Sequence, residues 1–209
     1  AWKLFRKESF RETAMQTYRF ILNEMSSHSG GYFSNTTISE DPSTAVYYSC
    51  SIKELQLMFP ERYQEISVAL GLDTRKEISA KQTPVRNSDT YHIINREELD
   101  SLKERRKEHR GYIKDTRIIT SYNSQLAKSL AIASVALENE EMLEEASTLF
   151  EYILNNNINA KGRLLRYTCC ANGCRFGFLS DYAGFTDAAV TMFKVTGKRE
   201  YRDIATNYL

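Results

Sequence analysis

The chain has 209 residues, 42% of them hydrophobic, and its 28 basic and 27 acidic residues leave a net charge of +1. This length suits one large or two small domains, and we expect a single domain across 1–209. The balanced charge argues against electrostatic capture of nucleic acid or of an anionic membrane. The chain has no apolar run of the roughly 18 residues that a spanning helix needs, and no signal-peptide layout. We therefore expect a soluble, cytoplasmic protein.

The chain opens on the end of one helix, and a tight connection leads into a second. The second helix is predicted over 9–25, with a capping-box pattern at Ser9–Glu12 and its apolar residues on one face. The pair Gly30-Gly31 ends this helix. A short extended piece is expected next, near Tyr32.

The long connection 34–114 is predicted to be an insertion between helical hairpins. We expect the following elements in it: a short strand over 44–50, a helix over 51–59 that starts with the capping box Ser51–Glu54, a helix from Pro60 to Gly71, a loop over 73–90 and a charged helix over 97–110.

The next stretch is polar over 115–123 and leads into a helix over 126–137 whose only charge is Lys128. Because that helix is apolar on nearly all faces, we expect it to be buried among other helices. A buried helix start that carries polar residues is a candidate ligand site.

The first helix–turn–helix junction recurs twice. A shift of 132 (142 − 10) superimposes its apolar and glycine positions on a second copy: Phe10 on Met142, Ala14 on Ala146, Tyr18 on Phe150 and Gly30 on Gly162. A shift of 191 (201 − 10) gives a third copy: Phe10 on Tyr201 and Ala14 on Ala205. Stacked α-hairpins bury their apolar faces against one another. The sequence therefore predicts an all-α fold of hairpin repeats, with short extended pieces near Tyr32, 45–50 and 164–167.

Four cysteines are too few for a disulfide framework in a chain of this length: Cys50, Cys169, Cys170 and Cys174. They also lack the paired Cys-x-x-Cys spacing of a structural zinc site. We expect reduced thiols, no metal site and no cofactor.

Taken together, these motifs resemble a known family. The segments that carry the resemblance follow in the same order: Gly30–Ser34, Ala45–Tyr48 with the helix after it, Arg105-Arg106, Asp115–Asn123 and Phe178–Ala183. They are similar to the C-terminal helical part of the YyaL-like proteins, which include the spermatogenesis-associated thioredoxin-like proteins. The resemblance implies part of an (α/α)6 barrel similar to six-hairpin glycosidases and sugar epimerases, within a longer protein that carries a thioredoxin-like domain.

The chain departs from that family at three motifs. The family's acidic Asp-Ala-Asp-Ser stretch is replaced by Asn35–Ser39, and its Asp-Asp-Lys and Trp-Asn motifs stand here as Asp115–Arg117 and Tyr122-Asn123. The lost acidic stretch favours a non-catalytic scaffold or binding module.

The alternative function is a carbohydrate-active enzyme, either a glycoside hydrolase or a sugar epimerase. A glycosidase needs two carboxyl groups that flank the bond, and Asp115 and Asp181 are the candidates. The candidate ligand-binding residues are aromatic rings and hydrogen-bond donors: Arg117, Tyr122, Asn123 and Tyr182. We expect all six side chains to meet at one barrel mouth.

The same residues also allow purely structural roles. Asp115 can pair with Arg117, Ser121 or Asn123 can cap the apolar helix, and Asp181 can cap a helix that begins at Tyr182. A cavity shared by Asp115 and Asp181 would favour the enzyme.

Both ends of the chain are apolar: Trp2, Leu4 and Phe5 at the start, and Ile204, Tyr208 and Leu209 at the end. Exposed apolar surface of this kind marks an interface. The expected partners are the remaining hairpins of a parent chain or a second copy of this one, together with a sugar ligand.

Overall fold

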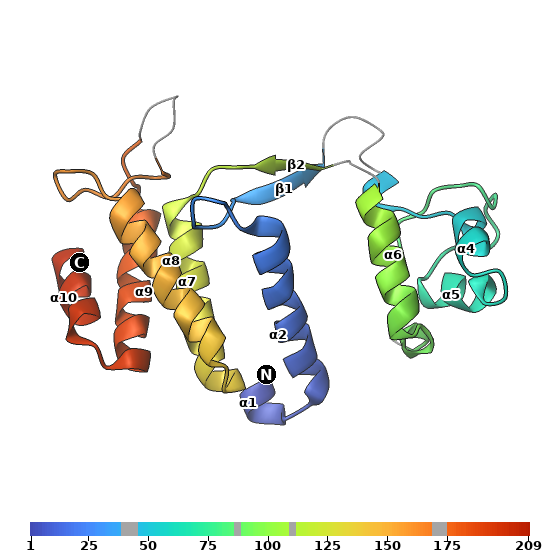
Figure 1. Ribbon diagram of the computed structural model, residues 1–209, viewed down its shortest axis with the longest axis horizontal. Helices are drawn as coiled ribbons and strands as arrows, with labels where there is room; N and C mark the ends of the chain where they lie inside the picture. The colour runs from blue at the N-terminus through green and yellow to red at the C-terminus, as the bar shows by residue number, and fades with distance from the viewer. Residues whose placement is uncertain (39–45, 86–88, 109–111, 169–174) are drawn as a thin grey trace. The chain divides into compact units, whose positions relative to one another are not determined.

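The computed structural model describes residues 1–38, 46–85, 89–108, 112–168 and 175–209. Helices predominate over short strands in these ranges (Figure 1), which confirms the predicted all-α fold. The helices and strands are α1 (Trp2–Phe5), α2 (Glu8–Phe20), β1 (Asn35–Ile38), α4 (Ile52–Met58), α5 (Tyr63–Ala69), α6 (Arg96–Glu108), β2 (Tyr112–Asp115), α7 (Thr120–Leu137), α8 (Glu140–Asn156), α9 (Leu179–Thr196) and α10 (Arg199–Asn207).

The chain forms two compact units. Unit 1 comprises Ala1–Asn35 and Lys114–Leu209, and unit 2 comprises Thr36–Ile113. The strands β1 and β2, which contain the two unit boundaries in the sequence, pair with each other in a two-stranded sheet. Unit 2 falls within the segment 34–114, and the three repeated junctions fall in unit 1.

Each repeated junction turns at a residue in the left-handed conformation. These residues are Arg6 (φ 50°) between α1 and α2, Glu138 (φ 53°) between α7 and α8, and Gly197 (φ 72°) between α9 and α10. They are separated by the two shifts read from the sequence (138 − 6 = 132 and 197 − 6 = 191). The same backbone turn therefore closes all three helix pairs, as the apolar pattern predicted.

A tight turn follows the second helix of the first two copies. Ser26 pairs with Tyr32 in an antiparallel bridge, and Ile158 pairs with Leu164 in the same way, 132 residues later. The turn over 26–32 lies against α8, because a Cβ atom added to Gly30 would lie 2.7 Å from Cδ2 of Tyr152. We call the segments 26–32 and 158–164 the two tip turns.

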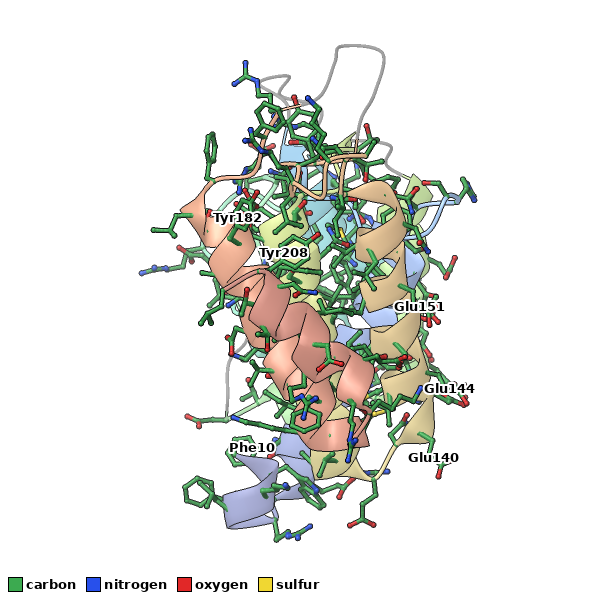
Figure 2. The ribbon with its side chains drawn as sticks, turned by 90° about the vertical axis from the view of Figure 1, so that its left-hand side faces the viewer. Phe10, Glu140, Glu144, Glu151, Tyr182 and Tyr208 are labelled. Atoms are coloured by element: carbon green, nitrogen blue, oxygen red, sulfur yellow. The ribbon has the colours of Figure 1, made fainter. Side chains whose placement is uncertain are left out.

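Aromatic rings fill the core of unit 1 between α8, α9 and α10. Phe150 stacks on Phe185 with ring centroids 5.0 Å apart, and Tyr201 meets Phe150 edge-on at 5.4 Å. Tyr208 meets Phe185 in the same manner at 5.1 Å and lies near Tyr182 (Figure 2). The end of the chain is therefore packed on the core, except for the exposed Leu209.

The other side of α8 is acidic. Glu140, Glu144 and Glu151 point away from the neighbouring helices (Figure 2). The N-cap residue Asn139 accepts a hydrogen bond from the backbone N–H of Met142 at 3.0 Å. An apolar inner face and an acidic outer face are the pattern expected for the outer helix of a hairpin.

Helix α7 differs from its prediction in two respects. It begins at Thr120 rather than at Leu126, so Tyr122 and Asn123 lie in its first turn. The expected burial on all faces is wrong, because Ile132 is 50% exposed and Val135 is 49% exposed. α8 and α9 pack along α7, and neither of these two side chains is among those packed on the core of unit 1.

Several shorter elements differ in part from those predicted. The capping box at Ser51–Glu54 is confirmed, whereas α2 has Lys7 as its N-cap and no side-chain cap at Ser9–Glu12. Residues 46–48 form a 3-10 turn rather than a strand, and 44 and 45 lie outside the described residues. The helix expected from Pro60 begins at Tyr63.

Unit 2 has a small apolar core of its own, built from α4, α5 and the residues beside them: Cys50, Ile52, Leu55, Ile66, Ala69, Leu70, Leu72 and Ile94. Next to this core, Glu54 accepts hydrogen bonds from the backbone N–H of Ser51, from Lys81 and from Arg105. Burial opposes the ionisation of Glu54, but these donors outweigh it and hold the pKa of its carboxyl at about 2.

Candidate functional site

The first turns of α7 and α9 lie side by side in unit 1 (Figure 1). The backbone N–H of Ser121, at the start of α7, donates to Oδ1 of Asp181, at the start of α9, at 3.0 Å. The two helix starts are close to each other, because a Cβ atom added to Gly184 of α9 would lie in ordinary contact with the carbonyl oxygen of Ser121, at 3.6 Å. The two helices therefore run parallel and begin at the same end of the unit.

Asp181 is fully buried between these helix starts. Besides Ser121, Arg166 donates to its Oδ1 at 2.8 Å, and the backbone N–H of Phe178 donates to its Oδ2 at 2.8 Å. α9 begins at Leu179, so Asp181 caps the helix from its third position rather than from the position before Tyr182. The carboxylate joins α7, α9 and the segment before α9, and it has no exposed oxygen to offer a ligand.

Asp115 lies at the end of β2 and is bound to Arg117. Its carboxylate accepts from the backbone N–H of Arg117 at 3.1 Å and from Nε at 2.9 Å, and it also pairs with Nη2. These bonds hold the pKa of the Asp115 carboxyl well below its ordinary value, against a smaller opposing effect of burial. This ion pair is one of the structural roles that the sequence allowed.

Asn123 and Tyr182 hold equivalent positions in α7 and α9 (182 − 123 = 59, as 197 − 138 = 59), and each fastens a tip turn. Asn123 is 1% exposed; its Oδ1 accepts from the Tyr32 N–H at 2.8 Å, and its Nδ2 donates to the Tyr32 carbonyl oxygen at 3.0 Å. The Tyr182 hydroxyl accepts from the Leu164 N–H at 3.2 Å. Both predicted ligand-binding side chains are thus engaged within the fold.

A cleft of about 300 Å³ lies between α7 and α9. Its lining residues are Ser121, Tyr122, Gln125, Lys128, Arg166, Ser180, Gly184 and Asp187. Of the six predicted side chains, Tyr122 belongs to this lining. Asp181 is buried behind the lining, where it is hydrogen-bonded to the lining residues Arg166 and Ser121. Asp115, Arg117, Asn123 and Tyr182 are not lining residues, so the six predicted side chains do not meet in this cleft.

Charges in the cleft are paired. Lys128 binds Oδ2 of Asp187 at 2.5 Å, and Arg166 binds Asp181 and the Ser121 hydroxyl, the latter at 3.0 Å. Neutral donors and acceptors remain for a ligand on the hydroxyls and on the exposed amide of Gln125. The arrangement is suited to hydrogen bonding of hydroxyl groups, and it offers no unpaired carboxylate for acid–base chemistry.

The lining residues of this cleft recur in the sequence at a fixed spacing, which the apolar pattern does not reveal. Ser121, Gln125 and Lys128 in α7 recur with the same spacing as Ser180, Gly184 and Asp187 in α9, each pair 59 residues apart. Corresponding positions of two parallel helices form the two walls. Such positions are found by aligning the inner helices with each other, whereas the shifts of 132 and 191 align the outer ones.

The described part of the chain offers little else for chemistry. It contains no group of three or more side chains placed to hold a metal ion. Cys50 is a buried free thiol, and burial raises the pKa of that thiol; Cys169, Cys170 and Cys174 lie outside the described residues. None of the helices in the described ranges is both long and apolar enough to cross a bilayer.

Comparison with known proteins shows distant similarity to solved structures. No family model matches the chain, and no curated protein matches its sequence. Among solved structures it is similar to cellobiose 2-epimerase from Bacillus thermoamylovorans, with a TM-score of 0.42 and 9% identity over 94% of this chain. The chain spans 54% of the length of that epimerase. A TM-score this low carries no argument, so the all-α assignment rests on the helices themselves.

Proposed function

We propose that unit 1 is a non-catalytic helical scaffold that binds a small hydroxylated ligand, such as a sugar, in the α7–α9 cleft. The cleft volume of about 300 Å³ is at the lower end of the range for small-molecule sites, which suits a monosaccharide. Hydroxyl and amide groups line it, and the exposed ring of Tyr122 stands at its edge. An aromatic face beside polar groups is a common way to hold a sugar ring.

The state of Asp181 is the observation that supports a non-catalytic role. Three donors occupy its oxygens and none of its surface is exposed. A general acid or base must come within hydrogen-bond reach of the substrate. Asp115, the other candidate carboxylate, is held by Arg117 outside the cleft lining.

Calorimetric titration with D-glucose, combined with a search for products by NMR, tests this function. We expect saturable binding and no conversion of the sugar. Gln125→Ala should weaken binding without reducing the amide-exchange protection of α7, because the Gln125 side chain is exposed in the cleft wall. Gln16→Ala, on the exposed face of α2, is the matched control and should bind as the unaltered protein does.

Two results would contradict the proposal. Equal binding by the Gln125 and Gln16 variants would place the ligand elsewhere. Formation of an epimer or a hydrolysis product, abolished by Asp181→Asn or Asp115→Asn, would establish the carbohydrate-active enzyme instead.

The scaffold role includes a partner. Leu4 and Phe5 of α1 are 82% and 63% exposed, and exposed apolar side chains of this kind mark interfaces. We propose that another α-hairpin, from a second copy of the chain, packs on α1. Sedimentation should then show a dimer that Leu4→Ser dissociates. A monomer at all concentrations would contradict this part of the proposal.

A further inference from the structure

Arg166 is fixed at the cleft with one edge of its guanidinium group free. Nη1 donates to the Ser121 hydroxyl at 3.0 Å and to Oδ1 of Asp181 at 2.8 Å, and the guanidinium carbon lies 5.5 Å from the centre of the Phe178 ring. Nε and Nη2 donate to no residue in the described parts of the chain. The side chain is 22% exposed and belongs to the cleft lining.

The free edge has a defined chemical preference. Nε and Nη2 present two parallel N–H groups, which match the two oxygens of a carboxylate in a bidentate contact. The bonds to Ser121 and Asp181 hold the guanidinium in place before a ligand arrives, so less conformational entropy is lost on binding. This pre-organisation distinguishes Arg166 from an arginine that is free to rotate on the surface.

The charge balance of the cleft limits the ligand to a small negative charge. Arg166 is neutralised by Asp181 and Lys128 is neutralised by Asp187, so these four side chains sum to zero. The N-terminal ends of α7 and α9 add partial positive charge at the same end of the unit. One carboxylate suits this balance better than a phosphate dianion does.

We propose that the ligand of the α7–α9 cleft is a small hydroxylated carboxylate, with its carboxylate on the free edge of Arg166 and its hydroxyls on Gln125 and Ser180. The inference rests on the proposed function, because it names the ligand class of the same cleft. It goes beyond that function in specifying a carboxylate group, which strengthens binding relative to a neutral sugar.

Calorimetric titration of the unaltered chain with D-glucuronate, D-glucose and D-glucose 6-phosphate tests the proposal. D-glucuronate should bind roughly tenfold or more tightly than D-glucose, because a hydrogen bond to a charged group is worth about 1.5–3 kcal/mol. Equal affinities for the two would overturn this inference and leave the proposed function standing. Tighter binding of D-glucose 6-phosphate would overturn the choice of a carboxylate, and binding of none of the three would overturn the inference and the function together.

Arg166→Lys locates the effect. Lysine keeps a positive charge for Asp181 but lacks the two-donor edge, so the affinity for D-glucuronate should fall by a larger factor than the affinity for D-glucose. Arg163→Lys is the matched control, since Arg163 lies 5.6 Å from the Phe176 ring and is not a lining residue. If the variant still prefers D-glucuronate to D-glucose, the assignment of the carboxylate to Arg166 is overturned. If the variant does not fold, the titrations of the unaltered chain with the three ligands still test the proposal.

Discussion

The substitution Asn123→Ala tests how α7 holds the first tip turn. It removes three hydrogen bonds of the side chain. Oδ1 of Asn123 accepts from the Tyr32 N–H at 2.8 Å, and Nδ2 donates to the carbonyl oxygens of Tyr32 at 3.0 Å and of Ile119 at 2.9 Å. The Ile119 oxygen keeps the backbone N–H of Asn123 as a partner. The two backbone groups of Tyr32, a residue that is 5% exposed, lose the partners that Asn123 provides.

The expected loss of stability follows from those two groups. Each buried polar group left without a partner costs about 1–3 kcal/mol, so we expect unit 1 to lose roughly 3 kcal/mol. A helix cap alone would cost about 0.5–2 kcal/mol. The matched control is Asn155→Ala, at an exposed position in α8, which should change stability by no more than about 0.5 kcal/mol.

Amide hydrogen exchange is the suitable assay, because a chain of two units does not have a single unfolding transition to analyse. The Tyr32 amide should lose its protection in Asn123→Ala, and the α7 amides should exchange faster in proportion to the loss of stability. Binding of D-glucose should persist in the folded fraction. A protected Tyr32 amide and unchanged stability would refute this account, and a selective loss of binding would restore Asn123 as a ligand residue.

Two further predictions concern the repeated junction and unit 2. Gly197→Ala should destabilise unit 1 by about 1 kcal/mol through its left-handed backbone alone, since the added methyl group contacts nothing within 4 Å, whereas Glu138→Gly should be neutral or stabilising in chemical denaturation. The pKa of Glu54 is lowered from 4.5 to about 2, so its contribution to unit 2 is complete above pH 4.5 and is lost as the pH falls towards 2. Glu54→Gln should flatten the stability profile over that range, and an unchanged profile would contradict the assignment.

The helical architecture could be predicted from the sequence because it depends on apolar spacing that survives in each copy. The recurrence of Ala14, Ala146 and Ala205 identified all three junctions, and left-handed residues stand at the matching position in each. The pairing of β1 with β2 was not predicted, because β1 carries no alternation of polar and apolar residues over Asn35–Ile38.

The candidate site was harder to predict than the fold. The polar run 115–123 pointed to the correct end of α7, but it could not show which polar side chains are used internally. Asn123 contacts the tip turn at Tyr32 and Asp181 contacts Ser121, and both contacts join residues far apart in the sequence. Arg166 was missed because a single arginine in a segment without periodicity gives no local signal.

The central claim is that the α7–α9 cleft binds a ligand and does not convert it. An amide-detected NMR titration of the whole chain with D-glucuronate tests this claim most directly. We predict that the perturbed signals cluster on 121–128 and 180–187, the two walls of the cleft, and that the spectrum of D-glucuronate stays unchanged during the incubation. Perturbations confined to unit 2 or to Asp115 would contradict the location, and the appearance of product signals would contradict the non-catalytic role.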